Sequence, residues 1–302
     1  AEMLGMLAGD ADAMYMYLSG AIMDSPDKFN IYQAMVDAAA EKGWETVYTD
    51  NVATSDYATV MTDYAELGYD LIFAPGNQYT DAVKQVAEEY PEIKFALLNG
   101  TVETDNIQSI LPDAEQIGYM AGALAGLMSK TNNIGFIGGM ELDTTKGKYE
   151  GYKEAAAYVA EKAGKTATTL DIVYSNSFSA SDKGIEFAKA MIDKGADVFF
   201  GDASAVDSGA RQAIDEYNAA QGSIKVFDIA QPADLLGQNE CIICSQVTDN
   251  SAMVGSCMEA VEAGKLGGDV IYGTLENGAL SAGAVSDLVP AEIKDQYNAY
   301  IE

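Results

Sequence analysis

Short apolar runs alternate with amphipathic segments along most of this chain. Most runs are continuous rather than alternating, which is typical of parallel strands covered by helices on both faces. The runs that predict strands are residues 14–18, 46–48, 71–74, 95–98, 107–110, 134–137, 170–174, 198–200, 226–229 and 242–247. Apolar residues at helical spacing predict helices over residues 31–41, 80–89, 113–130, 146–163, 180–194, 205–217 and 250–263. The alternation indicates an α/β fold with doubly wound parallel sheets.

Residues typical of helix ends support these boundaries. Asp113 with Gln116, and Ser179 with Asp182, have the spacing of an N-terminal cap and its partner three residues later. Glycine is the residue that most readily adopts the left-handed conformation found just after a helix. The glycines at such positions are Gly43, Gly68, Gly164, Gly195 and Gly264.

The most apolar segment, residues 117–128, is too short to span a membrane, which takes roughly 20 apolar residues. It carries Gly118, Gly122 and Gly126 at helical spacing. We expect these glycines to let the helix pack closely on a sheet.

Length and connectivity predict two domains. A chain of 302 residues is long enough for two cores, at about 150 residues per domain. Because no linker rich in proline or serine separates two halves, we expect the chain to cross between the domains more than once.

The charge balance excludes some partners. There are 17 Lys and Arg against 47 Asp and Glu, for a net charge of -30. Nucleic acids and anionic membranes attract clustered basic residues, so this chain is expected to bind neither. The chain contains no histidine, which excludes Ser-His-Asp catalysis and imidazole metal sites.

Catalytic and metal motifs are also missing. The sequence has no G-x-S-x-G motif and no Walker A loop. Cys241 and Cys244 form a C-x-x-C pair without a second pair, and Cys257 stands apart, so we expect buried free thiols. The interpretation is a protein that is not an enzyme and needs no cofactor or metal.

Polar and aromatic residues cluster where the predicted strands end, which is where open α/β sheets bind ligands. These candidate residues are Asp24, Phe29, Asn30, Asn77, Asn99, Phe178, Ser204, Asp228 and Gln246. One aromatic ring from each half, with amides and a carboxylate around them, fits a planar polar ligand held between two rings. Stacking of one base on such a ring contributes about 1–3 kcal/mol.

At these residues the sequence resembles the basic membrane protein family of ABC-transporter substrate-binding lipoproteins, of the purine-nucleoside receptor type. The segment from Ser129 to Met140 is similar to the family's "SKTGKVGFIGGM". Residues 24–30, 150–155 and 177–184 resemble "DDKSFNQ", "FEAGFEAG" and "SFSDPAKGK". The matches span nearly the whole chain.

The resemblance implies the type I periplasmic binding protein fold, in which two doubly wound domains are joined by three crossovers. Transferred to this chain, the crossovers lie near Leu111, near residues 246–249 and near residues 267–269. The N-terminal lobe is then residues 1–111 plus 247–267. The C-terminal lobe is residues 112–246 plus 268–302.

The resemblance also implies roles for individual residues. Phe29 and Phe178 match the family's two stacking phenylalanines, and Asp228 matches a carboxylate that holds ribose hydroxyls. Ser204 matches part of the family's glycine-rich turn.

Three positions depart from the family pattern. Ser19 and Asn99 replace acidic residues, and the uncharged Gln246 stands where a lysine usually follows the late strand. An amide both donates and accepts hydrogen bonds, whereas a carboxylate only accepts. Recognition of a purine therefore depends on whether these substitutions preserve the hydrogen-bonding pattern, and a free base or riboflavin remains an alternative.

The function expected from the resemblance is that of a monomeric solute-binding protein that delivers a nucleoside, with a purine expected, to the permease of an ABC importer. Closure of the two lobes on the ligand is the expected mechanism. A ligand sensor with the same fold is a second interpretation, and an enzyme acting on nucleosides the least favoured. The family implies an extracytoplasmic protein tethered by a lipid on an N-terminal cysteine, which this sequence, beginning at Ala1, does not include.

Overall fold

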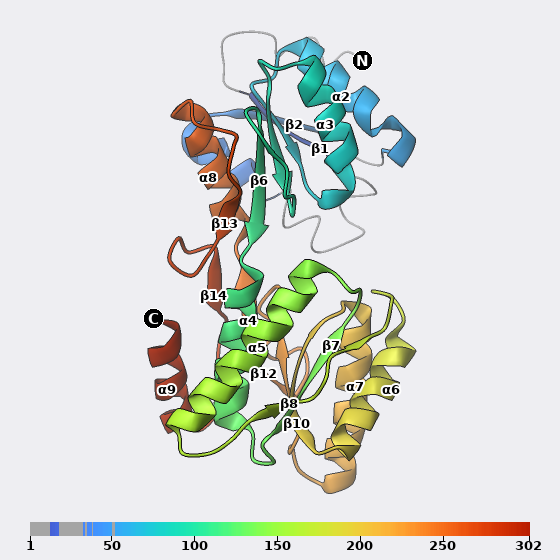
Figure 1. The fold of residues 1–302 in the computed structure, drawn as a ribbon, viewed down its shortest axis with the longest axis vertical. Coiled ribbons are helices and arrows are strands. Elements are labelled where there is room, and N and C mark those ends of the chain that lie inside the picture. The colour runs from blue at the N-terminus through green and yellow to red at the C-terminus, as the bar shows by residue number, and fades with distance from the viewer. Residues whose placement is uncertain (1–12, 18–32, 34, 38, 50–51) are drawn as a thin grey trace. The chain divides into compact units, whose positions relative to one another are not determined.

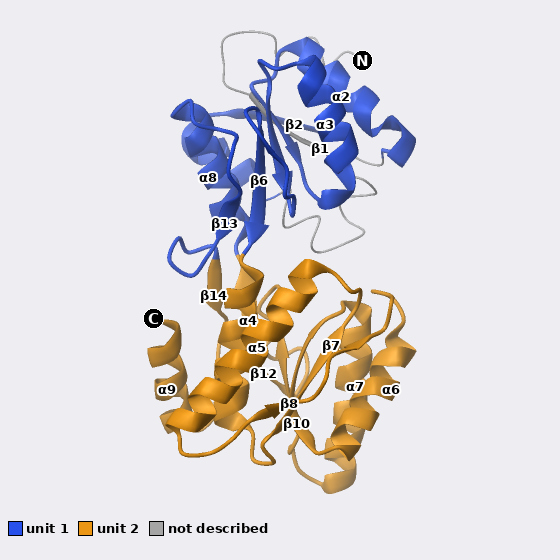
Figure 2. Cartoon of the chain, in the orientation of Figure 1, with its two compact units in different colours: residues 1–112, 249–279 blue, residues 113–248, 280–302 orange. Residues whose placement is uncertain are grey.

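The structure is a computed structural model in which residues 13–17, 33, 35–37, 39–49 and 52–302 are described. The chain divides into two compact units, each with its own parallel sheet (Figure 2). Unit 1 is residues 1–112 and 249–279, and unit 2 is residues 113–248 and 280–302. The chain therefore passes between the units three times, at 112–113, 248–249 and 279–280.

Unit 1 is a sheet with helices on both faces. Its sheet has the order β13-β6-β4-β3-β1-β2, all parallel, with β5 antiparallel to β6. The strands are β1 (Ala13–Tyr17), β2 (Glu45–Thr49), β3 (Leu71–Ala74), β4 (Lys94–Leu98), β5 (Glu103–Thr104), β6 (Ile107–Pro112) and β13 (Ile271–Gly273). The helices are η2 (Thr54–Asp56), α2 (Tyr57–Leu67), η3 (Asn77–Tyr79), α3 (Thr80–Glu89) and α8 (Asn250–Glu262). One core cluster lies under α2 and α3, and another lies under α8.

Unit 2 repeats this plan (Figure 1). Its sheet has the order β14-β12-β11-β10-β7-β8, with β9 pairing β7 and β14 antiparallel to β12. The strands are β7 (Asn133–Gly138), β8 (Thr168–Thr169), β9 (Val173–Tyr174), β10 (Ala196–Asp202), β11 (Phe227–Ala230), β12 (Ile242–Thr248) and β14 (Leu280–Ala282). The helices are α4 (Ala114–Met128), α5 (Asp143–Lys162), α6 (Ser181–Asp193), α7 (Ala205–Gln221) and α9 (Ala291–Ile301). A core cluster forms where α6 and α7 pack on the sheet.

The predicted α/β alternation is confirmed, because every apolar run named above contains or overlaps a strand. Only the last two residues of the run 170–174 form a strand, β9, and β8 ends directly before the run. Two helices were not predicted, α2 and α9, and part of the predicted helix 31–41 lies outside the described residues.

The third crossing lies later in the chain than predicted. We placed it near residues 267–269, but β13 pairs with β6 and so belongs to unit 1. The crossing occurs at 279–280, where the chain leaves unit 1 and forms β14 against β12.

The glycines of α4 contact a helix rather than the sheet, which corrects the prediction. A Cβ added to Gly118, Gly122 or Gly126 would overlap the backbone of α5, at Lys148, Tyr152 and Ala156 respectively. Figure 1 shows α4 and α5 side by side. The small residues therefore let two helix backbones approach each other closely.

One predicted helix cap is confirmed and the other is wrong. The Gln116 backbone N–H donates to Asp113 Oδ1 at 3.0 Å, so Asp113 caps α4. Ser179 caps nothing, because the helix begins at Ser181 and the preceding N–H groups of Ser179 and Ala180 donate to Ser177 Oγ at 3.0 and 3.2 Å. The five glycines predicted after helices all have positive φ.

Among the described residues, no helix combines the length and the apolar character needed to cross a membrane.

Candidate ligand site

The carboxyl edge of the unit 2 sheet gathers polar residues from three neighbouring strands. Asp202, the last residue of β10, pairs with Gly138, the last residue of β7, and β11 lies on the other side of β10. Gly139 directly follows β7 and Gln231 directly follows β11. Because parallel strands end at the same edge, both residues lie at this edge. The loops that carry Phe178 and Ser204 are hydrogen-bonded to this edge and to each other.

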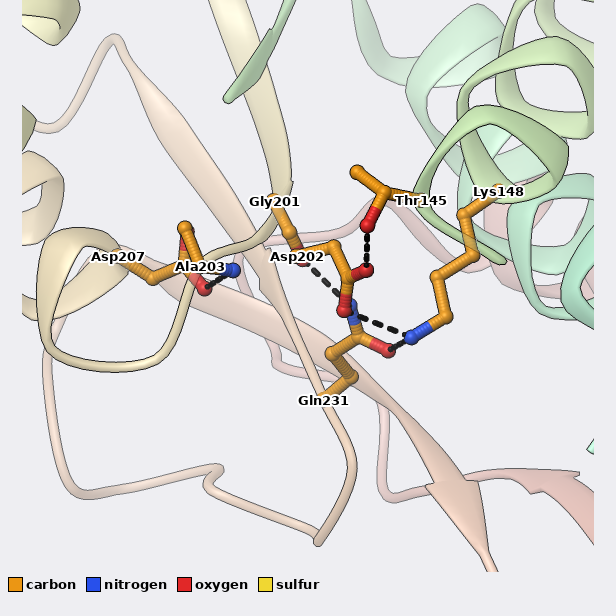
Figure 3. Close-up of polar contacts among 7 residues, drawn as sticks. All are labelled: Thr145, Lys148, Gly201, Asp202, Ala203, Asp207 and Gln231. Atoms are coloured by element: carbon orange, nitrogen blue, oxygen red, sulfur yellow. Dashed lines mark hydrogen bonds and ion pairs between the residues drawn. The ribbon is translucent and has the colours of Figure 1, made fainter. Parts of the chain in front are cut away.

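Asp202 is the centre of a polar cluster at this edge, drawn in Figure 3. Its Oδ1 accepts from Lys148 Nζ at 2.8 Å, and its Oδ2 accepts from Thr145 Oγ1 at 2.6 Å. Gln231 Nε2 donates to Gly201 O at 2.5 Å and to Asp202 Oδ1 at 3.3 Å, while Gln231 Oε1 accepts from Lys148 at 2.9 Å. Helix α5 supplies Thr145 and Lys148, so the cluster joins a helix to two strands.

The cluster is ionised and only partly exposed. Burial alone would raise the pKa of Asp202, but the charge of Lys148 and the hydrogen bonds from Lys148, Thr145 and Gln231 outweigh it, so the pKa lies below its ordinary value. The side chains of Lys148 and Asp202 are 15% and 20% exposed. A neutral ion pair of this kind offers both donors and acceptors at the surface, which suits an uncharged ligand with hydroxyl groups.

Phe178 stands beside this cluster with 43% of its surface exposed. A Cβ added to Gly139 would lie 2.5 Å from Phe178 Cδ1 and 3.1 Å from Asp202 O. The Phe178 ring and the backbone of Asp202 at the end of β10 therefore both adjoin Gly139. The loop is fixed by hydrogen bonds from Ser177 N to Gly139 O at 3.1 Å and from Ala205 N to Phe178 O at 3.0 Å. An exposed aromatic ring is thus held at the edge of the sheet.

Ser204 forms a turn between β10 and α7 with an uncommon backbone. Its φ is 54°, which few residues other than glycine adopt. Asp207, in the first turn of α7, accepts from the Ala203 N–H at 2.9 Å through Oδ2. Burial raises the pKa of Asp207 to about 7, and the carboxylates of Asp228 and Asp202 add to this, while the Ala203 N–H and Arg211 oppose it.

A family model described as "ABC transporter substrate-binding protein PnrA-like" (Bmp) matches residues 11–300. The chain belongs to the Bmp family. The resemblance drawn from the sequence is therefore confirmed, and the protein is a member of a family of substrate-binding proteins.

Relatives and a solved structure agree with this membership. A Lactococcus lactis protein named ABC transporter nucleoside-binding protein BmpA is 28% identical over 84% of this chain and 74% of its own length. An uncharacterised lipoprotein of Pyrococcus abyssi is 25% identical over 88% of this chain and 72% of its own. A solved protein described as a transcriptional activator of the comK gene from Bacillus halodurans shares the fold, with a TM-score of 0.78 and 21% identity over 96% of each chain.

Two residues predicted for the ligand site of this Bmp protein are buried inside unit 2. Asp228 is the second residue of β11, is 4% exposed and accepts from Arg211 Nε at 2.7 Å. Gln246 is 1% exposed, and its side-chain amide contacts the Tyr297 hydroxyl at 3.4 and 3.5 Å. The carboxylate at the edge is Asp202, because β11 ends in Ala230 and β10 ends in Asp202.

In unit 1, the structure brings two predicted residues to neighbouring strand ends. Asn77 begins η3 after β3 and is exposed, and its carbonyl accepts from Thr80 Oγ1 at 2.6 Å. Asn99 follows β4 with φ 56° and is also exposed. The strands β3 and β4 are paired, so these asparagines share one edge. The remaining predicted residues, all outside the described residues, are Ser19, Asp24, Phe29 and Asn30.

The cysteines carry none of the features of a reactive site. Cys241, Cys244 and Cys257 are free and buried, as predicted. Burial raises the pKa of all three thiols, that of Cys244 to about 11, so they stay protonated at neutral pH. Within the described residues, no group of three or more His, Cys, Asp or Glu side chains is placed to hold a metal ion.

Sequence reasoning missed Lys148, Asp202, Asp207 and Gln231. The signal for Asp202 was available, because it directly follows the apolar run 198–200 and so stands at the end of a strand. Lys148 and Thr145 lie on a helix, where nothing in the sequence marks them as neighbours of Asp202.

Proposed function

We propose that this Bmp protein is the extracytoplasmic binding component of an ABC importer and captures a nucleoside, with a purine nucleoside as the first candidate. The observation that carries the proposal is the exposed ring of Phe178 beside the Lys148–Asp202–Gln231 cluster. A nucleoside joins a flat aromatic ring to a sugar with hydroxyl groups, and this edge offers a partner for each part.

Phe178 is proposed to stack on the base. Its exposed face is available to a ligand, and its backbone is fixed by the bond from Ala205. Stacking depends little on the type of ring, so Phe178 alone does not distinguish purines from pyrimidines or riboflavin. The contribution of Phe29, Asn77 and Asn99 to the ligand site stays a prediction from the sequence.

The Asp202 cluster is proposed to bind the sugar hydroxyls, the role that we first assigned to Asp228. Lys148 donates two hydrogen bonds, to Asp202 and Gln231, and so has one of its three N–H groups left to donate. Asp202 Oδ2 accepts one hydrogen bond, from Thr145, and can accept a second. A hydroxyl can therefore donate to Asp202 and another can accept from Lys148. Because the pair is neutral overall, an uncharged sugar fits it better than a phosphate does.

The partner and the location follow from family membership. The Bmp family supplies substrate-binding proteins to ABC transporters, so a permease is the proposed macromolecular partner. The lactococcal relative is named as a nucleoside-binding protein and the archaeal relative as a lipoprotein, which supports a nucleoside ligand and a lipid tether. We propose that the protein acts as a monomer and has no catalytic activity.

A ligand sensor is the second candidate. The solved protein with the same fold is described as a transcriptional activator. The net charge of -30 disfavours direct contact with DNA, so a sensor role would pass through another protein.

Isothermal titration calorimetry on refolded protein tests the proposal. Adenosine, inosine, uridine, adenine, riboflavin and ribose form the panel, and refolding removes any ligand carried through purification. Binding of nucleosides, and weaker binding of adenine and ribose separately, is the expected result. Phe178→Ala should weaken every ring-containing ligand by about 1–3 kcal/mol. A protein that binds none of the nucleosides, or a Phe178→Ala variant with unchanged affinity, would contradict the proposal.

A further inference from the structure

The turn from Gly201 to Ala205 connects three parts of the proposed ligand site. It includes Asp202, the last residue of β10, it contains Ser204, and its last N–H donates to Phe178 O at 3.0 Å. A shift of this turn would therefore move the carboxylate, the serine and the ring together.

Asp207 is bonded to this turn at several points. Its Oδ2 accepts from the Ala203 N–H at 2.9 Å, and its own backbone N–H donates to Ser204 O at 3.1 Å. Its Oδ1 occupies the space that a side chain on residue 201 would need, since a Cβ built on Gly201 would overlap it. Figure 3 shows the Asp207 side chain directed at the backbone of Ala203.

The backbone of the turn needs such support. Ser204 has φ 54° and ψ -113° and forms no side-chain cap for α7. A residue other than glycine in a sparsely populated region of this kind costs about 1–3 kcal/mol, and it persists where its surroundings hold it. The carboxyl of Asp207 bonds the residue directly before Ser204.

We infer that Asp207 is a positioning residue that holds the 201–205 turn in the shape that unit 2 presents to its ligand. The inference rests on the proposed function, because it concerns the same site. Asp207 itself does not contact the ligand in this account, and acts through Ala203, Ser204 and Phe178.

The charges around Asp207 couple this support to pH. Asp202 of β10 and Asp228 of β11 are acidic neighbours, and Arg211 lies one turn further along α7. Lys148 of α5 is bound to Asp202. With its pKa raised to about 7, Asp207 changes charge within the physiological range, whereas Asp202, with a lowered pKa, stays ionised there.

Ligand binding should raise the pKa of Asp207 further. A ligand on Phe178 and Ser204 removes water from the turn, and loss of water disfavours the charged carboxylate. Binding then takes up a proton, so affinity is highest below pH 7 and falls as pH rises above it. The fall is about tenfold for each unit by which binding raises the pKa.

Titration calorimetry with adenosine between pH 6.5 and 8.5 tests this on the full chain, because adenosine itself does not change charge in that range. Wild type should lose affinity as pH rises. Asp207→Asn keeps an acceptor for the Ala203 N–H but no charge, so its affinity should match wild type at pH 6.5 and stay constant. Asp207→Ala removes the acceptor and should weaken binding about tenfold at pH 6.5. Glu216→Gln, a surface position on the same helix, is the matched control and should follow wild type.

A second measurement needs no ligand. In NMR spectra, the Ala203 amide proton should shift with a midpoint near pH 7 in wild type and in Glu216→Gln, but not in Asp207→Asn. If the Ala203 amide does not titrate, or if Asp207→Asn keeps the same pH dependence of affinity as wild type, the inference is overturned. If the amide titrates as expected but wild type binds no adenosine, the proposed function is contradicted. The result would still support Asp207 as the residue that positions the turn.

Discussion

Two aspartates on the parallel strands of unit 2 each pair with a cation, and they have opposite environments. Asp202 is bound to Lys148 at the carboxyl edge of the sheet, with 20% of its side chain exposed. Asp228 is bound to Arg211 inside the unit, with 5% of its side chain exposed. Both ion pairs are short, at 2.8 and 2.7 Å, so distance does not distinguish them.

The difference is position along the strand. Asp202 is the last residue of β10 and Asp228 is the second residue of β11. A carboxylate at the end of a parallel strand reaches the edge where ligands bind, whereas one near the beginning lies among helices and neighbouring strands. We therefore propose that Asp202 serves ligand binding and Asp228 serves stability, and four predictions test this division.

The largest effect is expected from Asp228→Ala. The variant leaves the Arg211 guanidinium buried without its partner, and breaking a buried pair in this way costs about 3–5 kcal/mol. Urea denaturation followed by circular dichroism measures this loss. Protein that remains folded should bind adenosine with unchanged affinity, because Asp228 does not reach the edge. A stable variant with reduced affinity would return Asp228 to the ligand site and contradict the division.

Asp202→Asn is expected to act on binding instead. The amide has the shape of the carboxylate but accepts weaker hydrogen bonds and leaves the Lys148 charge unbalanced. Affinity for adenosine should fall about tenfold, and affinity for adenine should not change. Calorimetry with both ligands measures the difference, and Glu150→Gln, an exposed position on α5, serves as the control. An equal loss for adenosine and adenine would remove the sugar from this cluster.

Asp207→Asn adds a smaller effect on stability with a defined sign. The folded pKa of about 7 lies above the unfolded value of about 3.9, so the folded state keeps a proton that the unfolded state releases. The contribution of Asp207 to stability is therefore fully present below about pH 4 and is lost as pH rises to about 7. Asparagine cannot lose a proton, so the variant should gain stability relative to wild type by up to about 1.4 kcal/mol for each pH unit in this range. Urea denaturation at pH 4.5, 6 and 8 measures the gain, and a constant difference would show that Asp207 does not titrate there.

The sequence is sufficient to predict the order of strands and helices in both units, because continuous apolar runs and helical periodicity carry that information locally. It was insufficient for α2, for α9 and for the short strands β5, β8, β13 and β14. The helix α2 buries Tyr57, Met61 and Tyr64, in a segment rich in threonine and tyrosine, which are not typical helix formers. The strand β13 is three residues long and is defined by its pairing with β6, which is more than a hundred residues away in the chain.

Prediction of the site was limited by register. The sequence predicted ligand residues at the carboxyl edges, and in the structure Phe178 is an exposed ring at one of them. It could not tell which aspartate reaches that edge, because Asp228 lies only two residues before the end of β11, whereas Asp202 is itself the last residue of β10. The partners of Asp202 depend on the packing of α5 over β10, and that packing comes from tertiary structure rather than from any spacing in the sequence.

The smallest predicted effect tests how much of Asp202's role depends on its being held in place. Thr145→Val removes the hydrogen bond of 2.6 Å to Asp202 Oδ2, while Lys148 and Gln231 remain bound to Oδ1. Losing this bond raises the pKa of Asp202 towards its ordinary value. Because that ordinary value is acidic, Asp202 remains ionised at pH 7.5. The stabilising effect of Asp202, which is present above its unfolded pKa and lost as pH falls through the folded one, should therefore disappear at a higher pH in the variant. At pH 7.5 we expect affinity for adenosine to fall by no more than about threefold, since the charge and the bond to Lys148 persist. Calorimetry at pH 7.5 and acid denaturation measure the two effects. If the affinity falls as far as in Asp202→Asn, the orientation of the carboxylate rather than its charge determines binding, and Thr145 must be counted with Lys148 and Gln231 in the ligand site.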